Sequence, residues 1–171
     1  MRSNSFKIAI AAIVAVGALG GILAILLRHD GSTTGHLSFA PTEPAPAPYA
    51  EFKQARVAYG DRCLKLLIAE TEAQRVQGLR NVKNLAPYDG MLFVFPKDNI
   101  AQFTMAGTPL PLDIAFFDEH GEQVNFQPMK PCPDGTDATC PPYSSDHEYR
   151  LALETPSGSQ HPGGTLGPCA A

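Results

Sequence analysis

The chain has 171 residues, with 13 Lys and Arg against 17 Asp and Glu, which gives a formal net charge of −4. It has 16 Pro, 15 Gly and no Trp, and no basic cluster. This composition disfavours nucleic acid as a partner and favours a fold of short elements joined by many turns.

The most informative segment is the apolar run Ile8–Leu27, which contains no charged or strongly polar side chain. A helix rises about 1.5 Å per residue and a bilayer core is about 30 Å thick, so roughly 20 apolar residues cross it. A secretory signal has a shorter apolar core, about 7–15 residues, with its cleavage site close behind. Here the best cleavage candidate, Ser38-Phe39-Ala40, comes well after the run. We therefore expect residues 8–27 to be an uncleaved signal anchor, with a cleaved signal peptide as the alternative.

The charges around this run predict its orientation. Arg2 and Lys7 precede it, whereas Arg28 follows it together with Asp30. Positive charge is favoured on the cytoplasmic side of a membrane helix, so residues 1–7 are expected in the cytoplasm. The sequence thus predicts a single-pass protein of the bacterial inner membrane with a periplasmic or extracytoplasmic C-terminal domain.

Residues 28–48 have no hydrophobic period and end in the Pro- and Ala-rich stretch Pro41–Pro48. Alternating proline favours an extended polyproline II conformation of about 3.1 Å per residue. The segment is therefore predicted to be a linker that holds a domain away from the membrane. The remaining residues, 49–171, have a length that suits one domain.

Beyond the linker, short runs that resemble strands alternate with turns that contain Gly or Pro. The seven strand candidates are Gln54–Tyr59, Arg62–Ala69, Gly90–Phe95, Ile100–Met105, Leu112–Phe117, Gln123–Met129 and Tyr149–Glu154. Gly60-Asp61 predicts a tight hairpin turn, and Pro96–Asn99 predicts a turn after the third candidate. The pattern indicates a mainly β domain, a compact sandwich or barrel-like fold with one or two short helices.

One helix start is well marked. Thr71 and Gln74 have the spacing of a capping box, in which the Thr hydroxyl accepts the Gln amide proton and the Gln side chain reaches back. A short helix is predicted to run to about Leu79, with Val76 and Leu79 on its buried side.

The four cysteines are Cys63, Cys132, Cys140 and Cys169. An even number of cysteines in an exported domain favours disulfides. A turn-forming segment of seven residues separates Cys132 from Cys140, so a bond between them closes easily and leaves Cys63 for Cys169. A metal site made by Cys132, Cys140 and His147 is the alternative, although the cysteine spacing is wider than in structural zinc sites.

A series of motifs follows in a fixed order along the domain. They are Gln74-Arg75, Gly78-Leu79, Leu85, Gly90–Pro96, Phe103-x-Met105-x-x-Thr108, Pro111–Phe116 and Leu151–Glu154. In this order and spacing they resemble the family of uncharacterised bacterial and archaeal proteins called domain of unknown function 192. The resemblance covers about residues 62–167. It implies a compact, mostly β sandwich or barrel with small helices, often placed after an N-terminal signal or anchor.

The chain departs from the family pattern at several positions. Members usually carry Phe-Trp-Met-Lys-Asn-Thr, and this chain has Thr104, Ala106 and Gly107 in place of the tryptophan, lysine and asparagine. Arg80 stands where methionine is usual. A family site built on the Lys-Asn pair would have lost its cation and its amide in this chain.

Three polar residues within or beside apolar elements are candidates for chemistry. Arg75 lies at the start of the predicted helix, Asp113 lies inside an apolar strand, and Glu154 ends another strand. Two carboxylates and a guanidinium suit an internal polar network, a polar ligand site or acid–base catalysis. A ligand would occupy a cleft near Phe103, Met105, Thr108 and Asp113.

Three functions remain open. The first is a non-catalytic binding or interaction domain of the cell envelope, whose partner is an envelope protein or a small ligand. The second is a small-molecule or metal-binding module that uses the cleft. The third is a hydrolase of envelope glycans with Asp113 and Glu154 as its carboxylate pair. No phosphate loop, zinc-protease helix or nucleophile elbow occurs, so no catalytic residue and no cofactor is assigned.

Overall fold

The computed structural model describes residues 42–159 and 162–170. The predicted signal anchor, residues 8–27, and most of the predicted linker lie outside these described residues. Within the described ranges, no helix combines the length and the apolar character that crossing a bilayer requires.

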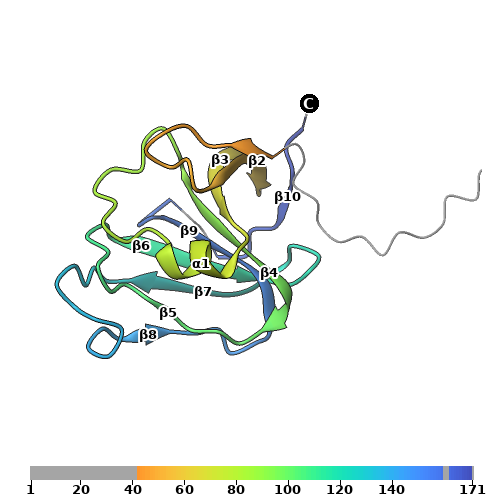
Figure 1. Ribbon diagram of the computed structural model, residues 1–171. Helices are drawn as coiled ribbons and strands as arrows, with labels where there is room; N and C mark the ends of the chain where they lie inside the picture. Colours follow the sequence, from red (N-terminus) through yellow and green to blue (C-terminus); the bar gives the residue numbers. More distant parts are fainter. Residues whose placement is uncertain (1–41, 160–161, 171) are drawn as a thin grey trace, which may run out of the picture. The chain divides into compact units, whose positions relative to one another are not determined.

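The described chain folds into one large sheet, one small sheet and one short helix (Figure 1). The elements in chain order are β1 (Glu43–Pro44), β2 (Lys53–Tyr59), β3 (Arg62–Ala69), α1 (Glu72–Gln77), β4 (Gly90–Asn99), β5 (Phe103–Thr104), β6 (Leu112–Phe117), β7 (Gln123–Met129), β8 (Pro142–Tyr143), β9 (Tyr149–Pro156) and β10 (Leu166–Pro168). The large sheet has the strand order β1-β2-β3-β4-β9-β6-β7, and β10 also pairs with β2. The small sheet joins β5 to β8. The prediction of a mainly β domain is confirmed.

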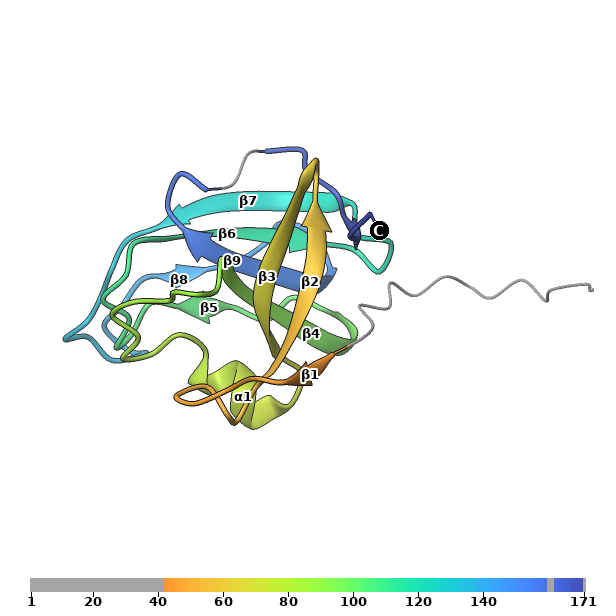
Figure 2. The ribbon, with the colours of Figure 1, turned by 90° about the horizontal axis from the view of Figure 1, so that it is seen from above.

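The large sheet curls strongly but does not close. Its strands β2 and β3 run across the direction of β6, β7 and β9 (Figure 2). Next to β10, Thr165 makes an isolated bridge to Glu122, just before β7. This contact does not extend into a ladder among the described residues. The barrel alternative of the sequence analysis is therefore wrong, because the edge strands meet at a single bridge.

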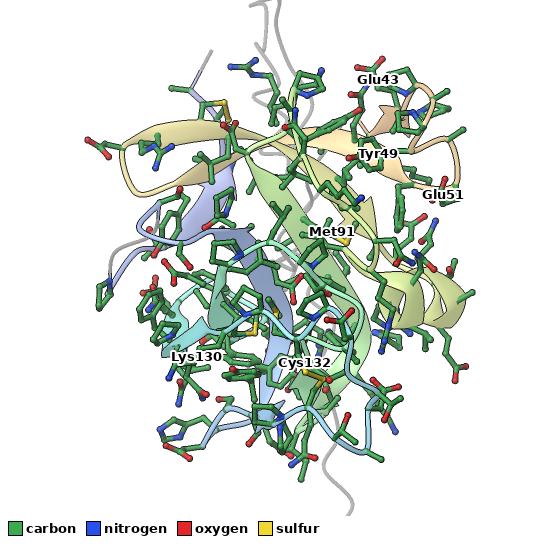
Figure 3. All side chains as sticks on the ribbon, turned by 90° about the vertical axis from the view of Figure 1, so that its left-hand side faces the viewer. Glu43, Tyr49, Glu51, Met91, Lys130 and Cys132 are labelled. Carbon is green, nitrogen blue, oxygen red and sulfur yellow. A yellow bond between two sulfur atoms is a disulfide. The ribbon has the colours of Figure 1, made fainter. Side chains whose placement is uncertain are left out.

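Two apolar clusters lie on opposite faces of the central strands. Successive side chains of a strand point to opposite faces, so Met91 and Phe93 of β4 belong to one cluster and Leu92 belongs to the other. Met91 lies in the middle of the molecule in the stick view (Figure 3) and is fully buried. All six residues of β6 are buried. The core therefore encloses the central strands from both sides, and the Met91 face also carries the site described below.

The helix α1 is short and starts as predicted. The Thr71 hydroxyl accepts a hydrogen bond from the Gln74 amide at 3.2 Å, and the Gln74 side chain accepts one from the Thr71 amide at 3.0 Å. Leu79 is buried as predicted, but Val76 is 67% exposed. The prediction for Val76 is wrong, because no residue of α1 is buried and Leu79 lies beyond the end of the helix at Gln77.

The predicted elements differ from the structure in one turn, in one strand and in three short strands that were not predicted. The predicted turn Pro96–Asn99 is instead the end of β4, which continues past a register shift and pairs Asn99 with Tyr149 of β9. The candidate Ile100–Met105 is reduced to β5, because only Phe103 and Thr104 find a partner strand. The short strands β1, β8 and β10 were not predicted, since each consists of two or three residues and includes a proline.

The last part of the predicted linker belongs to the folded domain. Glu43 and Pro44 pair with β2, and Ala45 is buried. The Phe52 amide donates to the Tyr49 carbonyl at 2.9 Å, which closes the turn that leads into β2. The domain therefore begins before Tyr49, the start that composition suggested.

Both predicted disulfides are present. Cys63 of β3 is bonded to Cys169 just after β10, and Cys132 is bonded to Cys140 across the loop between β7 and β8. No described cysteine is free. The first bond holds the C-terminal segment beside β2, and the second shapes the loop that borders the candidate site.

Candidate functional site

A cleft of about 460 Å³ lies between α1, the second half of β4, the segment that leads into β5 and the disulfide loop. Its lining includes Arg75, Arg80, Phe93, Phe95, Phe103, Thr108, Asp137 and Glu154. They come from segments that are far apart in the sequence. The cleft therefore exists only once the sheet has brought β4 beside β9.

Four of the six ligand-binding candidates from the sequence line this cleft. They are Arg75, Phe103, Thr108 and Glu154. Met105 does not, because its side chain is 1% exposed and packs in the core. Asp113 belongs to another place in the fold, as described below.

Glu154 is the unusual residue of the cleft. Its position on β9 lies opposite Met91 on β4 and Ile114 on β6, so its side chain points to the same face as these two apolar residues. It is only 4% exposed. Burial raises the pKa of the Glu154 carboxyl to about 8. At neutral pH the group is therefore mostly a neutral carboxylic acid.

The Glu154 carboxyl has no protein partner in the part of the chain that the structure describes. We find neither a hydrogen bond nor an ion pair to its side chain there, although one wall of the cleft reaches it. A buried polar group without a partner costs free energy, and a buried charge costs more. Glu154 therefore offers an unused hydrogen-bonding group to whatever enters the cleft.

Asp113 and Glu154 do not form a pair. Asp113 lies opposite Thr155, and Glu154 lies opposite Ile114, on the same two antiparallel strands. Residues offset by one position point to opposite faces of a sheet. The Asp113 carboxylate instead accepts a hydrogen bond from the Gly158 amide at 2.7 Å. The hypothesis of a carboxylate-pair hydrolase is therefore wrong for these two residues, since the sheet separates them.

Arg75 forms one side of the cleft and is held by the backbone around it. Its Nη1 donates to the Glu70 carbonyl at 2.6 Å and to the Val94 carbonyl at 2.9 Å. Its guanidinium lies 5.0 Å from the ring centre of Phe95, which is the geometry of a cation–π contact. These contacts fasten α1 to β4.

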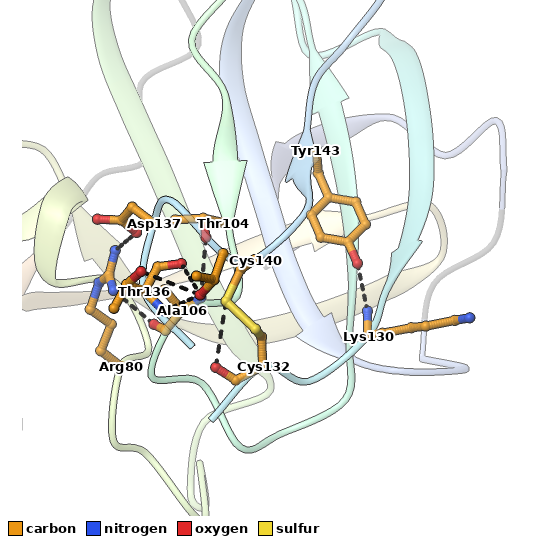
Figure 4. Close-up of a disulfide and its surroundings, with 10 residues drawn as sticks. Arg80, Thr104, Ala106, Lys130, Cys132, Thr136, Asp137, Cys140 and Tyr143 are labelled. Carbon is orange, nitrogen blue, oxygen red and sulfur yellow. Dashed lines mark hydrogen bonds and ion pairs between the residues drawn. A yellow bond between two sulfur atoms is a disulfide. The ribbon is translucent and has the colours of Figure 1, made fainter. Parts of the chain in front are cut away.

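Arg80 and Asp137 form an ion pair beside the cleft (Figure 4). Arg80 Nη2 lies 2.6 Å from Asp137 Oδ1, and Arg80 Nη1 donates to the Ala106 carbonyl at 2.8 Å. Asp137 lies in the loop that the Cys132–Cys140 disulfide closes. Neither residue is among the site residues predicted from the sequence. The replacement of the usual methionine by Arg80 was the signal that could have found the arginine.

Aromatic rings make the apolar part of the cleft. The ring centres of Phe93 and Phe103 lie 5.0 Å apart, edge to face, and Phe95 lies 6.4 Å from Phe103. Phe103 also contacts Phe116 and Tyr149 of the core. The wall is therefore continuous with the core and well ordered by packing.

Tyr149 anchors the segment that leads into β5. The Tyr149 hydroxyl donates to the Ala101 carbonyl at 2.7 Å, and burial raises the pKa of this hydroxyl. The Asn99 side chain accepts from the Ala101 amide at 2.9 Å and donates to the Tyr149 carbonyl at 2.9 Å. These bonds fix one wall of the cleft in place without a regular strand.

The metal alternative for the cysteines is wrong, because Cys132 and Cys140 are joined to each other and offer no thiolate. Among the residues that the structure describes, no group of three or more His, Cys, Asp or Glu is placed to hold a metal ion.

Comparison with known proteins places the chain as follows. The model of the DUF192 family, described as "Uncharacterized ACR", matches residues 55–164. No curated protein matches the chain. A protein of unknown function from Novosphingobium aromaticivorans DSM 12444 is similar in structure, with a TM-score of 0.62 and 21% identity over 80% of this chain and 99% of that one. A putative transcription regulator from Sinorhizobium meliloti 1021 has a TM-score of 0.59 and 26% identity over 67% of this chain and 93% of that one.

Proposed function

We propose that this chain, which belongs to the DUF192 family, is a membrane-tethered binding domain of the bacterial cell envelope whose cleft receives a small ligand. The observation that carries the proposal is the Glu154 carboxyl, which is buried at the cleft wall without a described partner. Phe103, Thr108 and Arg75 supply an apolar surface, a hydroxyl and a guanidinium around the same space. The lining thus combines apolar rings with polar and charged side chains, and convergent polar groups in a cleft are a common sign of a small-molecule site.

Location in the envelope is supported by two features of the sequence and one of the structure. Residues 8–27 have the length of a membrane helix, and the positive charges before them favour an exported domain. The two disulfides suit an oxidising compartment. The tether would keep the domain at the inner membrane, where its ligand or partner would reach it from the periplasm.

Binding is favoured over catalysis by the arrangement of the acids. Acid–base hydrolysis of glycans needs two carboxyl groups on either side of one bond, and Asp113 faces away from Glu154. Arg80 and Asp137 neutralise each other. The cleft therefore supports recognition of a molecule better than the breaking of a bond.

An interaction with an envelope protein is the second candidate. Val76 lines the cleft and is 67% exposed, and Ile100, next to the cleft wall, is 69% exposed. Two exposed large apolar side chains beside an aromatic cleft suit an apolar side chain of a partner. The name of the Sinorhizobium protein does not carry over, because a net charge of −4 disfavours DNA as a partner, as does the exported location proposed here.

A thermal-shift screen tests the proposal. The full-length protein in non-ionic detergent would be heated with metabolites, glycan fragments and amines, and a ligand that binds the folded state raises the melting temperature. The same screen on Glu154→Gln tests whether binding uses the cleft. Glu122→Gln, a matched change at an exposed carboxyl before β7, is the control. Ligands that shift both variants equally would bind elsewhere and would contradict the proposal.

A further inference from the structure

We infer that the ligand of this cleft carries a positively charged ammonium group, for which Glu154 is the counter-ion and the phenylalanine rings form the walls. The inference rests on the proposed binding function and adds the chemical class of the ligand.

Glu154 is the buried charged group of the cleft that has no described partner, whereas Glu72 is exposed to solvent. The facing charged groups are Glu72 and Arg75 of α1, Arg80 after α1, Asp137 of the disulfide loop and Glu154 of β9. Arg80 is paired with Asp137. Arg75 is bonded to two backbone carbonyls and lies against Phe95. Neither arginine makes an ion pair with Glu154 in the described chain.

A ligand can offset the free-energy cost of burying the Glu154 carboxyl without a partner. A buried carboxylate is stabilised by an opposite charge placed against it, whether or not the cation also donates a hydrogen bond. An anionic ligand would instead be repelled by the ionised form of Glu154. A cationic head placed against this carboxyl therefore compensates a cost that the fold itself leaves uncompensated.

Phenylalanine rings line the cleft beside Glu154. The faces of phenylalanine rings carry partial negative charge and attract cations, and quaternary ammonium ligands are held in this way. Phe93 and Phe103 line the cleft together with Glu154, and Phe95 already holds the guanidinium of Arg75 in such a contact. The walls thus suit the same kind of ligand group as the carboxyl does.

Binding of such a ligand releases one proton. The neutral Glu154 acid loses its O–H proton to solvent when the cation arrives, and the carboxylate then pairs with the cation. Affinity is therefore expected to rise with pH until Glu154 is ionised in the free protein. With a pKa of about 8, the dissociation constant should fall roughly 50-fold between pH 6 and pH 8, because only the ionised fraction is competent.

Tetramethylammonium is a suitable probe, because its charge does not change with pH. Its effect on the melting temperature of the full-length protein would be compared with that of tert-butanol, a neutral molecule of similar shape, and with sodium acetate, at constant ionic strength. We expect tetramethylammonium alone to raise the melting temperature, more at pH 8 than at pH 6. The effect should be lost in Glu154→Gln and kept in Glu122→Gln.

The outcomes separate the ligand class from the binding function. If tert-butanol or acetate raises the melting temperature in a way that depends on Glu154, and tetramethylammonium does not, the ammonium inference is overturned and the binding function stands. A rise with tetramethylammonium that Glu154→Gln keeps would also overturn the inference, because the cation would bind elsewhere. No response to tetramethylammonium at pH 8 would overturn it as well.

Discussion

Replacing Glu154 by Gln should remove a pH dependence of folding that is specific to this residue. The carboxyl has a pKa of 4.5 when it is exposed and about 8 in the folded protein, because burial disfavours its charged form. Below pH 4.5 both states hold the proton, and above that value the unfolded chain releases it first. The free energy of unfolding of the wild-type protein therefore falls as the pH rises from about 4.5 to about 8.

The size of this effect follows from the two pKa values. Each pKa unit corresponds to about 1.4 kcal/mol, so Glu154 alone should lower the free energy of unfolding by roughly 3–4 kcal/mol between pH 5 and pH 9. A small domain has about 5–15 kcal/mol in total, so the change is large enough to measure. Glutamine has nearly the same shape and does not titrate, which makes the difference between the two proteins specific to position 154.

The assay is urea unfolding of the oxidised wild-type and Glu154→Gln proteins at several pH values from 5 to 9. All other titrating groups are shared, so they cancel in the difference between the two. Wild type should lose stability relative to Glu154→Gln as the pH rises, whereas Glu122→Gln should run parallel to wild type. A difference between wild type and Glu154→Gln that stays constant within about 0.5 kcal/mol over this range would refute the reasoning.

Further changes test other parts of the structure. Gly90→Ala should destabilise strongly, by about 2–4 kcal/mol, because its Cβ would lie 2.3 Å from a backbone oxygen of β9; Gly167→Ala, whose Cβ meets nothing within 4 Å, should be near neutral in the same urea titration. Tyr149→Phe should cost about 1–2 kcal/mol, because a carbonyl of the cleft wall loses its donor, and an unchanged unfolding midpoint would contradict that role. Loss of the Cys63–Cys169 disulfide, whose cysteines are 106 residues apart, should destabilise the protein more than loss of the Cys132–Cys140 disulfide, whose cysteines are 8 residues apart. Chain entropy predicts a loss in the free energy of unfolding of about 4–5 kcal/mol for the first bond and about 2–3 kcal/mol for the second. Urea unfolding of Cys→Ser variants of each bond measures the two losses, and the reverse order would contradict the prediction.

Much of the sheet could be predicted from local patterns. The strands Arg62–Ala69, Leu112–Phe117 and Gln123–Met129 have the predicted bounds, because apolar runs bounded by turn residues are local signals. The stretch Pro96–Asn99 could not be predicted, because its turn residues are overridden by pairing with β9. The burial of Val76 was also predicted wrongly, since the side of a short helix that faces the core depends on how the helix packs, and α1 buries none of its residues.

The candidate site divides in the same way. Glu154 and Phe103 could be selected from the sequence, because a carboxyl at the end of an apolar strand and an aromatic residue within a family motif are visible there. The pairing of Arg80 with Asp137 could not, since 57 positions separate the two residues. The rejected pair of Asp113 and Glu154 shows the opposite error. Two acids on apolar strands looked equivalent until the register set them on opposite faces.

The sequence by itself determined the β character, the capping box of α1, the pairing of the four cysteines and the family. The first three follow from spacing, turn chemistry and redox context, which act over short stretches or need only counting, and the family follows from the resemblance of its motifs. Only the tertiary structure decided which acid faces the cleft and that Glu154 stays without a described partner there. The reason is that a side chain's burial and partners depend on strand register and on segments that are distant in the chain, and no local pattern records either.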